Sequence, residues 1–118
     1  MMRGNALLVS LVEQCPELAM SVIVLAELRF GFKFGNKYDQ NEALLQQFLS
    51  DTRIAVLEVD DITAEYYVEL ALVARKSGIA VGANDLWIAA LAWQHGYRLL
   101  TKDQDFKIFE KHIKLLGI

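Results

Sequence analysis

Three acidic side chains stand where a short apolar segment of this 118-residue sequence meets a helix-forming one. They are Glu27 in VIVLAELRF, Asp85 in GANDLWIAA and Asp103 in LLTKDQDF. Carboxylate oxygens are the ligands that hard divalent cations prefer, and no rival constellation of His, Cys or Ser residues competes with them. The three acids therefore predict an oxygen-rich site for Mg²⁺ or Mn²⁺.

Each acid also has an ordinary structural explanation. Glu27 has no cation three or four residues further on, so it fits either a metal site or an exposed turn of an amphipathic helix. Asp85 is also explained by the preference of a helix N-terminus for a carboxylate. Asp103 is followed four residues later by Lys107, which is typical of a loop or capping residue. Taken singly, none of the three is specific.

Short apolar segments alternate with longer segments of helical periodicity along the whole chain. Parallel strands need crossover connections of about a dozen residues or more, which single helices supply. We therefore expect an α/β fold, with a parallel sheet and helices on both faces. Bound ligands gather beyond the carboxyl ends of such strands. The predicted strands cover residues 18–24, 54–59, 97–101 and 113–118.

Helices are expected between these strands, and glycine or capping residues mark several of their ends. The segment NDLWIAALAWQH is apolar on nearly all sides, so it should pack between neighbours rather than lie on a surface. The predicted helices cover residues 6–15, the segment LAELRFGF, the segment NEALLQQFLSD, a helix capped by Asp60 or Asp61 that ends at Gly78, NDLWIAALAWQH with Asn84 as a possible cap and Gly96 as its end, and a short turn in DQDFKIFEKH.

Length and composition predict one domain spanning residues 1–118, because 54% hydrophobic residues suffice for a single core. No apolar run is long enough to span a membrane and no signal peptide is apparent, so we expect a cytoplasmic protein with no membrane contact. Cys15 is the only cysteine, which excludes an intramolecular disulfide and a cysteine-rich zinc cluster.

The formal net charge of -3 is not typical of a protein that coats nucleic acid. Local basic patches can still contact phosphates. Arg29, Lys33 and Lys37 step by four residues and are candidate RNA contacts. A solvated helix face explains the same spacing.

The segments MSVIVLAELRFG, GANDLWIAA and TKDQDF, in this order, resemble the second, third and fourth acidic motifs of PIN domains. The resemblance is closest to VapC-like toxins of bacterial toxin–antitoxin pairs and covers nearly the whole chain. It implies a Mg²⁺-dependent endoribonuclease that hydrolyses RNA, with a cognate antitoxin as partner and a homodimer as the expected assembly. The site residues that follow are Glu27, Asp85 and Asp103 as catalytic and metal-binding acids, Asp105 as a further metal ligand, and Ser21, Asn84 and Thr101 as supporting residues.

The sequence departs from the family pattern at its start. PIN domains of this type begin with a central strand that ends in an aspartate, within a pattern like LDTNV, and the first residues here show none. We therefore expect the first central strand and its aspartate to be missing, with unpaired neighbouring strands, fewer metal ligands and weak or no RNA cleavage.

The alternative function is a truncated toxin relic that acts only as an antitoxin-binding or dimerising module. Aromatic side chains would supply its contact surface. For Trp87 and Trp93 a place in the core is the favoured interpretation, because they lie in the most apolar helix. The candidates for this surface are Phe30, Phe32, Phe34, Trp87 and Trp93.

Overall fold

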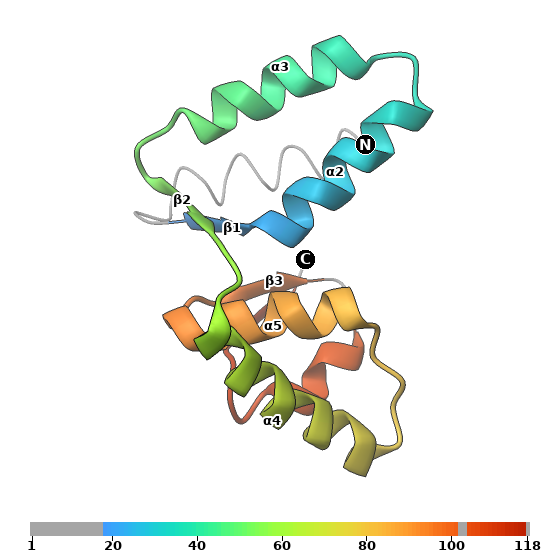
Figure 1. Ribbon diagram of the computed structural model, residues 1–118, viewed down its shortest axis with the longest axis vertical. Helices are drawn as coiled ribbons and strands as arrows, with labels where there is room; N and C mark the ends of the chain where they lie inside the picture. Colours follow the sequence, from blue (N-terminus) through green and yellow to red (C-terminus); the bar gives the residue numbers. More distant parts are fainter. Residues whose placement is uncertain (1–17, 102–103, 118) are drawn as a thin grey trace.

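A computed structural model describes residues 18–101 and 104–117 of the chain. The described residues confirm the α/β class, while the predicted helix over residues 6–15 lies outside them. The elements in chain order are β1 (Leu18–Ser21), α2 (Val22–Phe34), α3 (Tyr38–Leu49), β2 (Ile54–Leu57), α4 (Asp61–Ser77), α5 (Ala83–His95), β3 (Leu99–Thr101), the 3-10 helix η1 (Gln104–Phe109) and β4 (Leu115–Gly117) (Figure 1).

All strand pairing within the described residues is parallel, as predicted. Strand β1 pairs with β2, and Leu18 lies opposite Ile54. Strand β3 pairs with β4, and Leu99 lies opposite Leu115. No described strand joins the two pairs, so the described part of the sheet consists of two separate two-stranded pieces (Figure 1).

The first strand is shorter than predicted, because the chain turns into α2 at Val22. Ser21 has an extended backbone, and its side-chain oxygen accepts a hydrogen bond from the Val24 amide at 3.1 Å. This cap satisfies an amide that has no partner within the first helical turn. The β-branched residues that favoured a longer strand therefore form the start of a helix.

The other strands are shorter than predicted too. Strand β2 ends at Leu57 rather than residue 59, and β4 (Leu115–Gly117) begins two residues later than the predicted start at residue 113. Strand β3 begins at Leu99 rather than residue 97, because the Tyr97 amide donates to the Ala92 carbonyl and closes the end of α5.

Glycine ends two helices, as predicted. Gly78 and Gly96 have φ angles of 71° and 72°, in the left-handed region that a residue with a Cβ atom avoids. Each glycine amide returns to the last turn of its helix, from Gly78 to Arg75 and from Gly96 to Trp93. These positions fix where α4 and α5 stop.

The predicted cap is confirmed for α4 and is wrong for α5. Asp60 caps α4, with its carboxylate accepting from the Thr63 amide at 2.9 Å. This hydrogen bond is the main reason that the pKa of Asp60 lies below its usual value. Asn84 was expected as a possible cap of α5, but Gly82 occupies the cap position without a side-chain hydrogen bond. Asn84 therefore lies inside the first turn.

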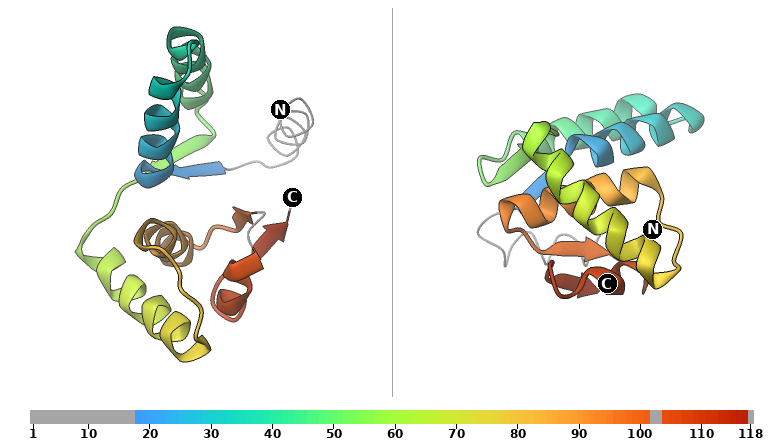
Figure 2. Two further views of the ribbon diagram at one scale, coloured as in Figure 1. Left: turned by 90° about the vertical axis from the view of Figure 1, so that its right-hand side faces the viewer. Right: turned by 60° about the horizontal axis from the view of Figure 1, so that its bottom comes forward.

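Helix α5 is the centre of the molecule. It lies between α2 on one side and α4 on the other (Figure 2). The prediction that this apolar helix packs between neighbours is confirmed. Trp93 packs against the core and meets Tyr66 edge to face, with ring centroids 4.9 Å apart. The buried cluster consists of Leu70, Ala74, Leu86, Ala89, Ala90, Ala92, Phe106, Phe109 and Ile113.

A buried polar contact joins the start of α4 to the end of α5. The Thr63 side chain is fully buried, and its hydroxyl lies 2.6 Å from Oε1 of Gln94. The Gln94 amide nitrogen donates in turn to the Asp60 carboxylate at 3.2 Å. The network holds together two helices whose contacting residues are far apart in the sequence.

Replacing Thr63 by valine should lower the free energy of unfolding by about 1–3 kcal/mol, because the Gln94 side-chain oxygen loses its donor and the Asp60 amide loses its acceptor. Urea denaturation followed by circular dichroism measures the difference. The matched control is Thr63→Ser, which keeps the hydroxyl and loses only a methyl group. Equal destabilisation by valine and serine would show that packing, and not the hydrogen bond, is important here.

Candidate functional site

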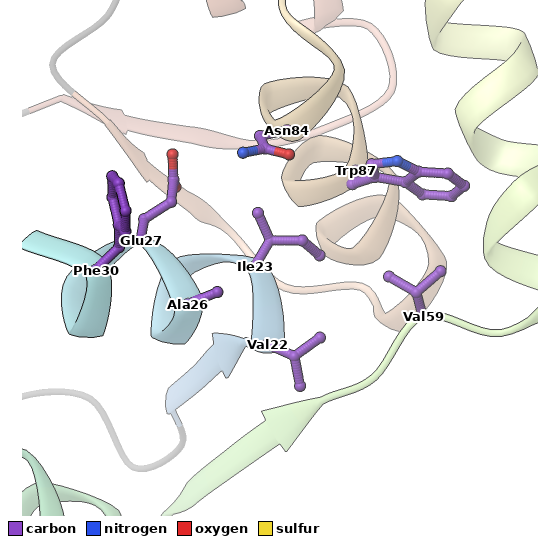
Figure 3. Close-up of a pocket in the computed structure, with 8 residues that line it drawn as sticks. All are labelled: Val22, Ile23, Ala26, Glu27, Phe30, Val59, Asn84 and Trp87. Carbon is purple, nitrogen blue, oxygen red and sulfur yellow. The ribbon is translucent and has the colours of Figure 1, made fainter.

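A pocket of about 640 Å³ lies between α2 and the first turns of α5. Its wall is mainly apolar, and Glu27 and Asn84 contribute its polar side chains (Figure 3). A few polar groups within a largely apolar wall are the usual pattern of a ligand site. The lining residues are Val22, Ile23, Ala26, Glu27, Phe30, Val59, Asn84 and Trp87.

Glu27 reaches this pocket because α2 starts directly after β1. With Ser21 as its cap, the helix places Glu27 less than two turns from the end of the strand. Its side chain is exposed. Glu27 is therefore both an exposed helical glutamate and a residue of the pocket wall. The carboxylate is accessible to a cation from solution.

Asp85 lies in the first turn of α5, as predicted, and it is half-buried. The amides at this end of the helix favour a negative charge. Its neighbour Asn84 is exposed and lines the pocket together with Glu27. Because α2 packs against α5, elements that carry two of the three predicted acids meet here.

The remaining predicted acids belong to the segment after β3. Asp103 lies outside the described residues, and so does the side chain of Thr101, whose backbone ends β3. Asp105 is exposed in the first turn of η1. Within residues 18–101 and 104–117, no three His, Cys, Asp or Glu side chains form a group able to hold a metal ion. The complete ligand set therefore stays a prediction.

Ser21 has a definite structural role. It is one of the few buried polar residues, with 7% of its surface exposed, and its hydroxyl is used by the Val24 amide. It supports the site indirectly, by fixing where α2 begins and hence where Glu27 points.

Two of the three residues in the predicted basic stripe have partners inside the protein. Arg29 forms an ion pair with Glu42 of α3 at 3.0 Å. The Lys33 ammonium lies 3.9 Å from the centroid of the Tyr38 ring. Lys37 is exposed at the cap position of α3. Arg29 and Lys33 thus tie α2 to α3, and phosphate binding by the stripe stays a prediction.

Sequence reasoning missed two side chains in the pocket wall. Trp87 was favoured as a core residue, but it is only half-buried and lies against Tyr67, with ring centroids 4.2 Å apart. Phe30 was weighed only as a protein contact, yet it borders the pocket beside Glu27 (Figure 3). The spacing of three between Glu27 and Phe30 is the signal that places both on one helix face.

The profile of the PIN domain family matches residues 4–111 of this chain. The chain therefore belongs to the PIN domain family. Among curated proteins, it is 36% identical to Ribonuclease VapC2 of Rickettsia felis over 91 residues, which cover 76% of this chain and 66% of the relative. It is 32% identical to Ribonuclease VapC4 of Mycobacterium tuberculosis over 90 residues, covering 76% and 69%. The chain thus spans about two thirds of the length of these relatives.

Solved structures of VapBC proteins have the same fold as this chain. VapBC2 from Rickettsia felis, bound to a DNA fragment from its promoter, superposes with a TM-score of 0.75 at 34% identity, covering 86% of this chain and 74% of that chain. VapBC-5 from Mycobacterium tuberculosis, a member of the VapBC family of toxin-antitoxin systems, superposes with a TM-score of 0.68 at 31% identity, covering 85% and 81%. None of the described helices is long and apolar enough to cross a membrane.

Proposed function

We propose that this protein is a divalent-metal-dependent endoribonuclease, with residues 1–118 acting as one PIN domain and as the toxin of a toxin–antitoxin pair in the cytoplasm. The observation that carries the proposal is the placement of Glu27. In a chain of the PIN family, this exposed carboxylate borders a pocket that Asn84 also lines, and Asp85 follows Asn84 in the first turn of α5. Relatives named as ribonucleases support the assignment.

The chemistry of these side chains suits Mg²⁺ or Mn²⁺. Glu27 and Asp85 offer carboxylate oxygens, and such oxygens are the preferred ligands of both ions. Asp103 and Asp105, from the segment after β3, would complete the set. The donors fit in type, and the accessible Glu27 carboxylate allows a hydrated ion to enter.

Hydrolysis of an RNA phosphodiester needs a positioned water molecule and compensation of the negative charge that develops on the phosphate. A bound Mg²⁺ ion would supply both. Glu27 and Asp85 would hold the cation, while the Asn84 amide would donate to a phosphate oxygen. The apolar side chains of Trp87 and Ile23 would limit the number of water molecules that reach the scissile bond.

The first test is an RNA cleavage assay with purified protein in Mg²⁺, with and without EDTA. We expect weak Mg²⁺-dependent cleavage that EDTA abolishes and that Asp85→Asn reduces at least about 100-fold, since loss of a carboxylate ligand removes several kcal/mol of transition-state stabilisation. Equal rates for the wild type and Asp85→Asn would contradict the proposal. Thermal melting confirms that the variant is folded.

One observation favours a second function. The rings of Phe30 and Phe34 are 67% and 79% exposed, as in a surface that contacts another protein. The second function is that of a truncated toxin relic. Such a protein would not cleave RNA but would still bind its antitoxin or form homodimers. Co-purification with an antitoxin encoded beside it, together with no Mg²⁺-dependent cleavage, distinguishes this function from the first.

A further inference from the structure

One face of α2 carries a line of side chains that runs out of the pocket. Ile23, Glu27, Phe30 and Phe34 are spaced by four, three and four residues, which places them along the same face of a helix. Ile23, Glu27 and Phe30 line the pocket, and the Phe30 ring stands beside the Glu27 side chain (Figure 3). Phe34 continues the line beyond the pocket.

The two phenylalanines of this line are unusually exposed. Phe30 is 67% exposed and Phe34 is 79% exposed, although phenylalanine is among the residues most often buried. Their rings meet edge to face, with centroids 4.9 Å apart, and so form one continuous aromatic surface. The core of the protein does not use this surface. It borders the pocket that holds Glu27.

We propose that Phe30 and Phe34 form an aromatic platform on which an unpaired base of the RNA substrate stacks while the adjoining phosphate lies at Glu27. The proposal rests on the proposed ribonuclease function and assigns two substrate-binding residues to it. Proteins bind single-stranded RNA by stacking its bases on exposed aromatic rings, because every base has a π-face. A base held inside a duplex cannot stack in this way, so the platform selects unpaired RNA.

The distance between Glu27 and Phe30 along α2 is consistent with a base that stacks beside a bound phosphate. The rise from Glu27 to Phe30 is about 4.5 Å, since each residue of an α-helix advances about 1.5 Å. That step is comparable to the rise of about 3.4 Å per nucleotide along each strand of a DNA double helix. A base on Phe30 would therefore belong to a nucleotide next to the phosphate at Glu27.

Charge around the platform favours RNA over an apolar protein segment as its occupant. Lys33 lies between Phe30 and Phe34 in the sequence of α2, with its ammonium 3.9 Å from the centroid of the Tyr38 ring, and Lys37 follows Phe34 by three residues. Both lysines are exposed. Exposed aromatic rings, exposed lysines near them in the sequence and a carboxylate that can hold a metal ion match the needs of a base, a phosphate and a hydrolytic site together.

The test measures the affinity of a fluorescein-labelled single-stranded RNA in EDTA, which prevents cleavage, by fluorescence anisotropy of the full chain. Phe30→Leu removes the ring and keeps an apolar side chain, and we expect about tenfold weaker binding. Phe30→Trp should restore affinity, because a larger ring still stacks. Leu44→Ala, at another exposed apolar position on α3, is the matched control and should change nothing.

A second readout reports the stacking itself. With 2-aminopurine in the same RNA, the wild type should quench the fluorescence of the base, and Phe30→Leu should not. A blunt duplex of the same sequence should bind the wild type and Phe30→Leu equally. Circular dichroism melting of each variant confirms that the chain is folded.

Two outcomes would contradict the aromatic platform without contradicting the ribonuclease function. If Phe30→Leu binds RNA as tightly as the wild type while Asp85→Asn still abolishes cleavage, the ribonuclease function stands and the platform does not. If Phe30→Leu keeps its RNA affinity but shifts the sedimentation coefficient of the protein, the rings are a protein contact instead. Absence of RNA binding by the wild type would overturn the platform, and absence of Mg²⁺-dependent cleavage by the wild type would overturn both proposals.

Discussion

Replacing Phe109 by alanine is expected to lower the free energy of unfolding by about 3–5 kcal/mol, the usual cost of emptying a phenylalanine site in a core. Phe109 ends η1 and is fully buried. It belongs to the cluster that η1 forms with α4 and α5, which also contains Leu70 and Ala89. Because the same cluster contains Leu86, the residue after Asp85, this core fixes the helix that presents the acid.

The loss is large because neighbouring groups can refill the space only in part. Ala89 is too small to reach into it, and Leu70 already packs fully within the cluster. Domains of this size are typically stable by about 5–15 kcal/mol, so the variant would lie near the limit of folding. Urea denaturation followed by tryptophan fluorescence is a suitable measurement, because Trp93 packs against the same cluster.

The matched control is Phe34→Ala, which removes the same ring from a side chain that is 79% exposed. Its effect should stay within about 0.5 kcal/mol, as for most surface substitutions. A similar loss for both variants would mean that Phe109 is not the core residue that its burial indicates.

Replacing Glu27 by glutamine is expected to reduce Mg²⁺-dependent RNA cleavage by at least about 100-fold, while the protein stays folded. Glutamine keeps the size of the side chain and removes its charge, and divalent-ion affinity depends on the number of charged ligands. A loss of about 2.7 kcal/mol in transition-state stabilisation corresponds to this factor. Binding of Mn²⁺, followed by electron paramagnetic resonance, should weaken in parallel.

Glu69→Gln is the matched control, since Glu69 is also an exposed helical glutamate but lies on α4, away from the pocket lining. It should leave cleavage and Mn²⁺ binding unchanged. If Glu27→Gln weakens cleavage and leaves Mn²⁺ binding intact, Glu27 acts on the RNA or the water molecule rather than on the cation. Unchanged cleavage in Glu27→Gln would remove this residue from the site.

The residue types of the site and their order along the chain could be predicted from the sequence. Acids at the starts of helices indicated oxygen chemistry, and the placement of Asp85 in the first turn of α5 is confirmed. The prediction that Asn84 can cap α5 is wrong, because the helix begins two residues earlier than that cap would allow, directly after Gly82.

The side chains around the site were harder to assign, since burial depends on packing partners distant in the sequence. Trp87 and Trp93 occupy one apolar helix, yet Trp93 packs against the core and Trp87 borders a pocket. Arg29 was a candidate phosphate contact, and the fold pairs it with Glu42, thirteen residues away. Periodicity alone carries no information on such partners.

The sequence by itself determined the α/β class, the order of the acids and the helix ends at Gly78 and Gly96, because these depend on local backbone preferences and on short-range patterns. Only the tertiary structure decided that Glu27 and Asn84 share a pocket and that the ring of Phe30 stays outside the core. Both outcomes depend on how α2 packs against α5, and these helices are separated by two other helices and a strand. Contacts over such separations are set by the packing of the whole fold.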